Sequence, residues 1–130
     1  MLCLDTDILI DYLRGVLAAQ VYFSSQARTV FCISAVTVVE LWAGTETAVH
    51  QRDWQQKEER LHEFLGSFTV LGVDVKTAQS AGVLRRDYRI PFADAIIAAT
   101  ALLYDFPLAT RNVRHYRIVE ATGLRLIQPY

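Results

Sequence analysis

Short apolar runs alternate with longer segments of helical periodicity along the chain. Each apolar run predicts a strand, and the runs occupy residues 1–4, 30–33, 68–71, 107–109 and 124–127. Apolar positions at three- and four-residue spacing predict helices, over residues 7–13, 17–25, 35–44, 50–65, 75–88 and 91–104. Ser34 and Asp74 are the expected N-caps of two of them. Strands that alternate with helices, without a hairpin signal, predict a parallel sheet with helices on both faces.

The length and composition describe one globular domain. We expect residues 1–130 to form a single doubly wound α/β domain with four or five parallel strands. Hydrophobic residues make up 52% of the chain and charged residues 21%, which excludes a disordered protein. No apolar run approaches the roughly 20 residues that cross a bilayer, and no secretion signal opens the chain. Cys3 and Cys32 lie in apolar runs, so we expect buried thiols and a cytoplasmic location.

Charge is unevenly distributed along the chain. The net charge of −1 gives no overall sign of nucleic-acid binding. Residues 85–130 nevertheless hold seven basic residues against four acidic ones, and all seven are arginine, whose forked side chain suits phosphate. On charge alone, a solvated and mildly basic face is the preferred interpretation. His50, His62 and His115 are scattered among polar neighbours and are interpreted as surface residues.

Three acidic residues stand alone in apolar segments. Asp5 ends the first predicted strand, Glu40 is the only charged residue of 29–45, and Asp94 is the only one of 90–104. A buried carboxylate costs several kcal/mol unless it is paired or binds a metal, and no Lys or Arg accompanies these acids locally. Taken singly, Asp5 is equally well explained as a helix N-cap, and Asp94 as an acid on a helix dipole. Glu40 lies two turns into its helix, where neither explanation applies.

The predicted fold brings these acids to one edge of the sheet. Asp5 follows a strand directly, and ligands of open parallel sheets bind beyond the carboxyl ends of the strands. Thr110, Arg111 and Asn112 follow the fourth predicted strand and add polar groups at the same edge. Converging carboxylates repel unless a cation lies between them, and an all-oxygen ligand set favours Mg²⁺ or Mn²⁺. We therefore expect a divalent-metal site and hydrolysis of a phosphate ester.

Four segments carry a family resemblance across essentially the whole chain. Their sequences are LDTDILID (residues 4–11), TVVELWAG (37–44), IPFADAIIAATA (90–101) and LATRNV (108–113). In this order and spacing they resemble the motifs of PIN domains, and most closely those of VapC-type toxins of prokaryotic type II toxin–antitoxin pairs. The first motif is weakly specific by itself, but the four together are strongly specific.

The resemblance implies a Mg²⁺- or Mn²⁺-dependent endoribonuclease. Asp5, Glu40 and Asp94 are then the catalytic acids and metal ligands, Thr110 is a supporting hydroxyl, and Asn112 stands where the family often has a fourth acid. Asn112 can ligate a metal but adds no charge, so the resemblance does not decide whether the site holds one metal ion or two. Asp7 stands where the motif commonly has Asn, and we interpret it as helix-capping. We expect a metal-activated water to attack phosphorus and to leave 5′-phosphate and 3′-hydroxyl ends.

The resemblance also implies partners. The RNA substrate is expected to contact arginines of the basic segment, for which the candidates are Arg85, Arg86, Arg111 and Arg114. A VapB-type antitoxin is expected to lay an apolar helix in a groove near the first helix or the Trp42–Trp54 region, and to direct a basic side chain at the acids. A homodimer is a further family expectation.

Two alternatives stay open from the sequence. Asp5-Thr6-Asp7 resembles the start of haloacid-dehalogenase-type phosphatases, in which the first Asp forms an aspartyl-phosphate. That chemistry also needs a late Lys and an acid pair, which residues 107–130 lack. The second alternative is an inactive PIN-like binding module, which Asn112 favours and the retained acids Asp5, Glu40 and Asp94 oppose.

Overall fold

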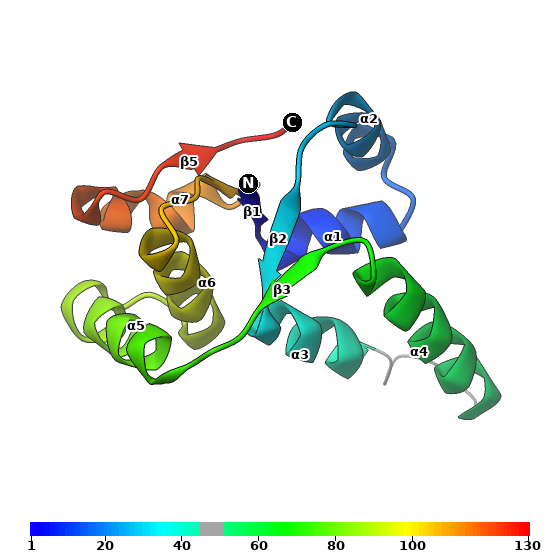
Figure 1. Cartoon of the computed structure of the whole chain (residues 1–130), viewed down its shortest axis with the longest axis horizontal. Helices are drawn as coiled ribbons and strands as arrows, with labels where there is room; N and C mark the ends of the chain where they lie inside the picture. Colours follow the sequence, from blue (N-terminus) through cyan, green and yellow to red (C-terminus); the bar gives the residue numbers. More distant parts are fainter. Residues whose placement is uncertain (45–50) are drawn as a thin grey trace.

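The architecture is a five-stranded parallel sheet. A computed structural model describes the backbone of residues 1–44 and 51–130, and the side chains of residues 1–44 and 55–130. The strands are β1 (Leu2–Leu4), β2 (Phe31–Ser34), β3 (Thr69–Leu71), β4 (Leu108–Ala109) and β5 (Leu126–Ile127). Their order in the sheet is β3-β2-β1-β4-β5, and every neighbouring pair is parallel (Figure 1). The predicted fold class is confirmed.

Helices fill the connections between the strands. They are α1 (Thr6–Leu13), α2 (Leu17–Ser25), α3 (Ala35–Ala43), α4 (Gln51–Leu65), α5 (Val75–Tyr88), α6 (Phe92–Leu103) and α7 (Val113–Tyr116), with the 3-10 helix η2 at Arg117–Thr122. The expected helices lie within one or two residues of the observed ones, and Ser34 and Asp74 cap α3 and α5 as predicted. The sequence reasoning did not predict α7 and η2, because such short helices show no apolar periodicity.

Alternation along the strands divides the core into two layers. Cys3, Cys32 and Leu108 point to one face, where they pack with α5, α6 and α7. Leu4, Ile33 and their neighbours point to the other face and pack with α1 and α4. Successive strand side chains point to opposite faces, so strands of only two to four residues can serve both layers. The two cysteines are buried as expected, and they are direct partners across β1 and β2.

The centre of the sheet fixes where a ligand can bind. From β1 the chain builds outward through β2 to β3 on one side, and β4 and β5 lie on the other side (Figure 1). The order of the strands therefore reverses between β1 and β4, and open α/β sheets bind ligands at such a reversal. Asp5 and Thr110 directly follow these two strands, and the Asp5 backbone nitrogen donates to the Ala109 oxygen at 2.9 Å. In the described part of the chain, no helix is long and apolar enough to span a membrane.

Candidate active site

Asp5 is both a helix cap and a buried acid. It is the N-cap of α1, where Oδ1 accepts a hydrogen bond of 2.8 Å from the Thr6 backbone nitrogen. Oδ2 accepts a second one, also of 2.8 Å, from the Thr110 hydroxyl, so that β1 and β4 are joined through this carboxyl group. Only 5% of the residue is exposed. Burial, and then the negative charges of Asp7 and Asp94, raise the pKa of Asp5 to about 7 against the effect of these hydrogen bonds.

Asp94 reaches the same place from the first turn of α6. Its charge contributes to the raised pKa of Asp5, so the two carboxylates lie within each other's electrostatic field. Asp94 Oδ2 lies 3.5 Å from His115 Nδ1, and half of the His115 side chain is exposed. The prediction of a surface histidine holds for this exposure, but it missed the contact with Asp94. The missed signal was that His115 follows the fourth motif on the same edge of the sheet.

Glu40 is linked to the acids through a threonine. The Thr6 hydroxyl donates to Glu40 Oε1 at 2.7 Å. The Thr37 hydroxyl lies 3.0 Å from the Thr6 hydroxyl. Because Thr6 follows Asp5 directly, this contact ties α3 to the end of β1. Glu40 itself is exposed, and therefore the expectation of a buried carboxylate at this position is wrong. Thr37 of the same helix is fully buried, and an apolar sequence context does not reveal that Glu40 lies outside the core.

The loop after β4 supports Asp5 from the other side. Thr110 is fully buried, and its hydroxyl donates to Asp5 while it accepts a hydrogen bond of 2.9 Å from the Asn112 backbone nitrogen. The expected supporting role of Thr110 thus has a defined geometry. Asn112 is exposed, and it precedes α7 without a capping bond from its side chain.

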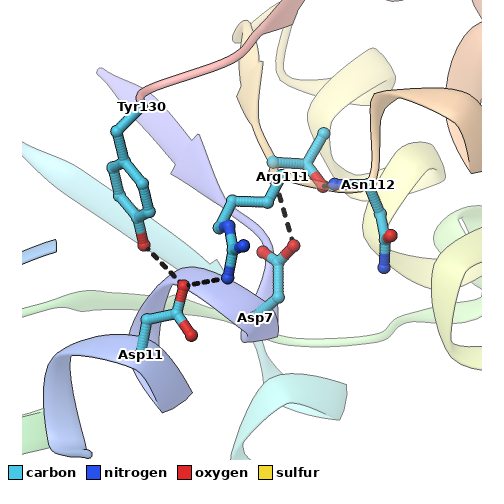
Figure 2. Close-up of polar contacts among 6 residues, drawn as sticks. Asp7, Asp11, Arg111, Asn112 and Tyr130 are labelled. Carbon is cyan, nitrogen blue, oxygen red and sulfur yellow. Dashed lines mark hydrogen bonds and ion pairs between the residues drawn. The ribbon is translucent and has the colours of Figure 1, made fainter. Parts of the chain in front are cut away.

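Arg111 is engaged within the protein. Its backbone nitrogen donates to Asp7 Oδ2 at 3.0 Å, and its Nη1 donates to Asp11 Oδ2 at 2.6 Å (Figure 2). The Tyr130 hydroxyl donates to the same Asp11 oxygen at 2.9 Å, and the Tyr130 ring centroid lies 5.7 Å from Arg111 Cζ. Among the predicted RNA contacts, Arg111 therefore joins the loop after β4 to α1 through two aspartates.

The other candidate arginines lie on exposed surface. Arg85 and Arg86 are in the last turn of α5, and Arg85 Cζ lies 5.4 Å from the ring centroid of Phe92, two residues before Asp94. Arg86 pairs with Asp87 at 2.8 Å. Arg114 is exposed on α7, next to His115. Arg85 thus lies at the start of α6, and Arg114 lies beside the residue that contacts Asp94.

The acids present a two-carboxylate site rather than a cage. Within residues 1–44 and 55–130, no three Asp, Glu, His or Cys side chains lie close enough together to enclose one ion. The ion pairs of the described residues give Asp5 no basic partner, so its ionised form needs another source of positive charge. Mg²⁺ typically takes one or two protein carboxylates and keeps several waters. Asp5 and Asp94 are carboxylates of the kind that such an ion takes, and Glu40 is linked to this place through Thr6.

A tyrosine that the sequence reasoning overlooked also belongs here. Tyr116 is fully buried at the end of α7, and its hydroxyl has no hydrogen-bond partner among the described residues. Burial, and then the charges of Asp5 and Asp94, raise the pKa of Tyr116. Its ring packs in the core layer of α5 and α6. In the sequence, Tyr116 therefore could not be distinguished from an ordinary aromatic residue of the core.

The family follows from a match over most of the sequence. A profile of the PIN domain family matches residues 2–121, and the chain belongs to this family. The predicted resemblance is thereby confirmed, and the phosphatase interpretation of Asp5-Thr6-Asp7 is set aside.

Among curated proteins, the chain is similar to Ribonuclease VapC10 of Mycobacterium tuberculosis. The two are 36% identical over 126 residues, which cover 92% of this chain and 89% of that protein. Among solved structures, it is similar to a toxin–antitoxin complex from Klebsiella pneumoniae (TM-score 0.81, 27% identity, 100% of this chain and 98% of that one). It is also similar to FitAcB from Neisseria gonorrhoeae (TM-score 0.84, 26% identity, 99% and 98%).

Proposed function

We propose that this protein is a metal-dependent endoribonuclease toxin, and that residues 1–130 form its single PIN domain. The observation that carries the proposal is Asp5: a buried carboxyl at the strand-order reversal, without a basic partner and in the field of Asp94. The similarity to Ribonuclease VapC10 supports RNA as the substrate. Mg²⁺ or Mn²⁺ is the proposed cofactor, because the acids offer oxygen ligands alone. We place the activity in the cytoplasm, where RNA is available.

The site residues divide the work. A bound divalent cation supplies a Lewis acid that activates water and offsets phosphate charge. Asp5 and Asp94 would hold it, and Thr110 fixes the orientation of Asp5 through its hydroxyl. Glu40 is oriented by Thr6 and exposed, so its carboxylate is positioned to accept a proton from the water that attacks phosphorus. The expected products carry 5′-phosphate and 3′-hydroxyl ends.

The arginines account for RNA binding in this proposal. Arg85 and Arg86 are exposed at the end of α5 and Arg114 is exposed on α7, and in this proposal they contact backbone phosphates. Asn112, exposed after β4, would add a neutral ligand or contact substrate. Phosphate contacts fix position rather than base identity, and so these residues orient the RNA without selecting its sequence.

A groove next to Glu40 suits an inhibitory partner. Its apolar lining comes from Ile10 and Leu13 of α1, Leu41 of α3 and Leu61 of α4, and Glu40 also lines it. We propose that a VapB-type antitoxin seats an apolar helix here and directs a basic side chain at Glu40. The structures of toxin–antitoxin complexes with this fold support such a partner. Trp42 packs on the core beside this groove, and the Trp54 side chain lies outside the described residues. A homodimer is part of the same proposal.

The decisive experiment is cleavage of a total cellular RNA pool by the purified protein with Mg²⁺ or Mn²⁺, with both product ends mapped. We expect discrete cuts that carry 5′-phosphates and that disappear with EDTA and in Asp94→Asn. Asp105→Asn, at an acid whose side chain is 96% exposed, is the matched control and should cut like the wild type. Cutting that survives Asp94→Asn would overturn the assignment. Metal-dependent stabilisation without cutting would instead indicate an inactive binding module.

A further inference from the structure

Two buried polar atoms at the site lack hydrogen-bond partners. They are Asp7 Oδ1 and the Tyr116 hydroxyl, and no other side-chain atom of the described residues shares this condition. Buried polar groups in folded proteins are nearly always paired with protein or ordered water, and an unpaired one costs about 1–3 kcal/mol. Two such atoms at one site therefore point to a polar ligand that completes their bonds.

The Tyr116 hydroxyl lies on the side of the acids. Its helix, α7, is held at the site at two points: the Asn112 backbone nitrogen bonds Thr110, which bonds Asp5, and His115 faces Asp94. The side chain is 0% exposed, so solvent does not satisfy the hydroxyl. Burial, then the charges of Asp5 and Asp94, and then a side-chain interaction with Asp5 raise the pKa of Tyr116. The phenol therefore lies next to the Asp5 carboxyl group, without the geometry of a hydrogen bond to it.

Asp7 approaches the same acids from α1. It follows Asp5 by two residues in the first turn of the helix, and among charged groups it has the largest effect on the raised pKa of Asp5. Its Oδ2 accepts the Arg111 backbone nitrogen, so its carboxyl plane is fixed while Oδ1 stays unpaired (Figure 2). A helix cap has no need of a buried and unpaired oxygen. The interpretation of Asp7 as a capping residue is therefore incomplete, because Asp5 already caps this helix.

The two atoms do not bond to each other, although one is an acceptor and the other both donates and accepts. We propose that Asp7 Oδ1 and the Tyr116 hydroxyl bind the water shell of the divalent cation held at Asp5 and Asp94. This inference rests on the proposed function and adds two positioning residues to it. Mg²⁺ and Mn²⁺ sites with few carboxylates keep coordinated waters, whose protons need acceptors.

The test is the affinity of the purified full-length chain for Mn²⁺ alone, measured by titration calorimetry and by the metal-dependent rise in melting temperature. Asp7→Asn and Tyr116→Phe keep the shape of each side chain, and we expect each to weaken Mn²⁺ binding by about tenfold, as for other groups that orient bound metals. Asp87→Asn and Tyr22→Phe change an exposed acid and a half-buried phenol elsewhere, and both should bind like the wild type. Far-UV circular dichroism of the metal-free variants verifies the fold.

The outcomes separate this inference from the proposed function. If Asp94→Asn abolishes Mn²⁺ binding while Asp7→Asn and Tyr116→Phe bind as tightly as the wild type, the inference is overturned. The partner of Asp7 Oδ1 and of the Tyr116 hydroxyl is then an ordered water unrelated to the metal, and the proposed function stands. If the wild type binds no Mn²⁺ at millimolar concentration, both fail. Weakening in both variants, with unchanged controls, supports the assignment.

Discussion

Nη1 of Arg111 lies 2.6 Å from Asp11 Oδ2, and this contact joins the loop after β4 to the middle of α1. The Tyr130 hydroxyl shares the same oxygen at 2.9 Å, and the backbone of Arg111 bonds Asp7 at 3.0 Å (Figure 2). Asp11 is largely buried and carries two donors on one oxygen, so the loop has a fixed position on the helix. The residue before Arg111 is Thr110, whose hydroxyl holds Asp5. Arg111 is therefore placed to position the site from outside it.

We predict that Arg111→Ala lowers kcat for RNA cleavage by about an order of magnitude, because a shift of Thr110 displaces Asp5 and small displacements of reacting groups are costly. KM should change little, since Nη1 of Arg111 is held by Asp11 and the guanidinium is not free to turn toward phosphate. The measurement is steady-state cleavage of a fluorogenic RNA. Arg114→Ala, at an exposed arginine of the same region, serves as the control and should raise KM instead. A rise in KM alone for Arg111→Ala would contradict the positioning role and would indicate that Arg111 contacts RNA.

The pH dependence of stability should reveal the raised pKa of Asp5. The carboxyl ionises near pH 4 in the unfolded chain and with a pKa of about 7 in the folded one. Between these values the folded state keeps a proton that the unfolded state has released, so the free energy of unfolding falls as pH rises, and the loss is complete above about pH 7. The effect is on the order of a few kcal/mol at most.

Urea unfolding in EDTA at pH 5 and pH 8 measures this effect. The wild type should lose more stability between the two pH values than Asp5→Asn does, because the amide has no proton to release. Asp105→Asn, with its exposed side chain, should follow the wild type. Parallel losses in the wild type and Asp5→Asn would show that Asp5 ionises normally in the fold. In a parallel series without EDTA, added Mn²⁺ should reduce the loss at pH 8, since a cation binds the ionised carboxylate.

Thr6 and Glu40 should act as one unit in catalysis. Thr6→Val removes the hydroxyl that orients Glu40, and we expect cleavage to fall on the order of tenfold. Cleavage by Glu40→Gln should fall at least as far. The double variant should be no slower than Glu40→Gln alone, because the effects of substitutions within one hydrogen-bond network are not additive. Thr6→Ser keeps the hydroxyl and should retain most of the activity. Additive losses in this cycle would show that the two residues act independently.

The groove beside Glu40 gives a prediction about inhibition. Leu13→Asp places a charge on an apolar wall of the groove, where the leucine is 42% exposed, and so the change should be tolerated by the fold. We expect this variant to cleave RNA normally but to resist neutralisation by the co-expressed antitoxin. Val39→Asp, at an exposed apolar residue of α3, is the matched control. Neutralisation of Leu13→Asp at the wild-type ratio would exclude this groove as the binding site.

The fold could be predicted because its signals are local. The apolar runs, the caps at Ser34 and Asp74 and the alternation of elements each depend on neighbours in the chain. Asp5 and Asp94 were identified for a related reason: an isolated charge in an apolar segment is visible without knowledge of the fold, and the sheet rule gives its place. This reasoning could not predict which way a side chain of a helix points. It identified Glu40 but could not show that the residue faces outward.

The remaining features depend on contacts between distant segments. Nothing in the sequence near Asp11 indicates that Arg111 and Tyr130 both reach one of its oxygens, since these partners are 100 and 119 positions away. Tyr116 looks like a core aromatic residue, and only the absence of a hydrogen-bond partner for its hydroxyl distinguishes it. The roles of Arg111, Tyr116 and His115 follow from spatial placement that periodicity and composition do not encode.

The bond between Thr110 and Asp5 spans 105 positions of the chain, and it has a consequence for biosynthesis. A ribosome makes the acid Asp5 105 residues before its supporting hydroxyl, so a nascent chain carries an unfinished site until Thr110 has been added. Strand β4 and the loop after it must leave the ribosome before the sheet can close around β1. Until then, the carboxyl group of Asp5 lacks the hydrogen bond that fixes its orientation in the folded protein.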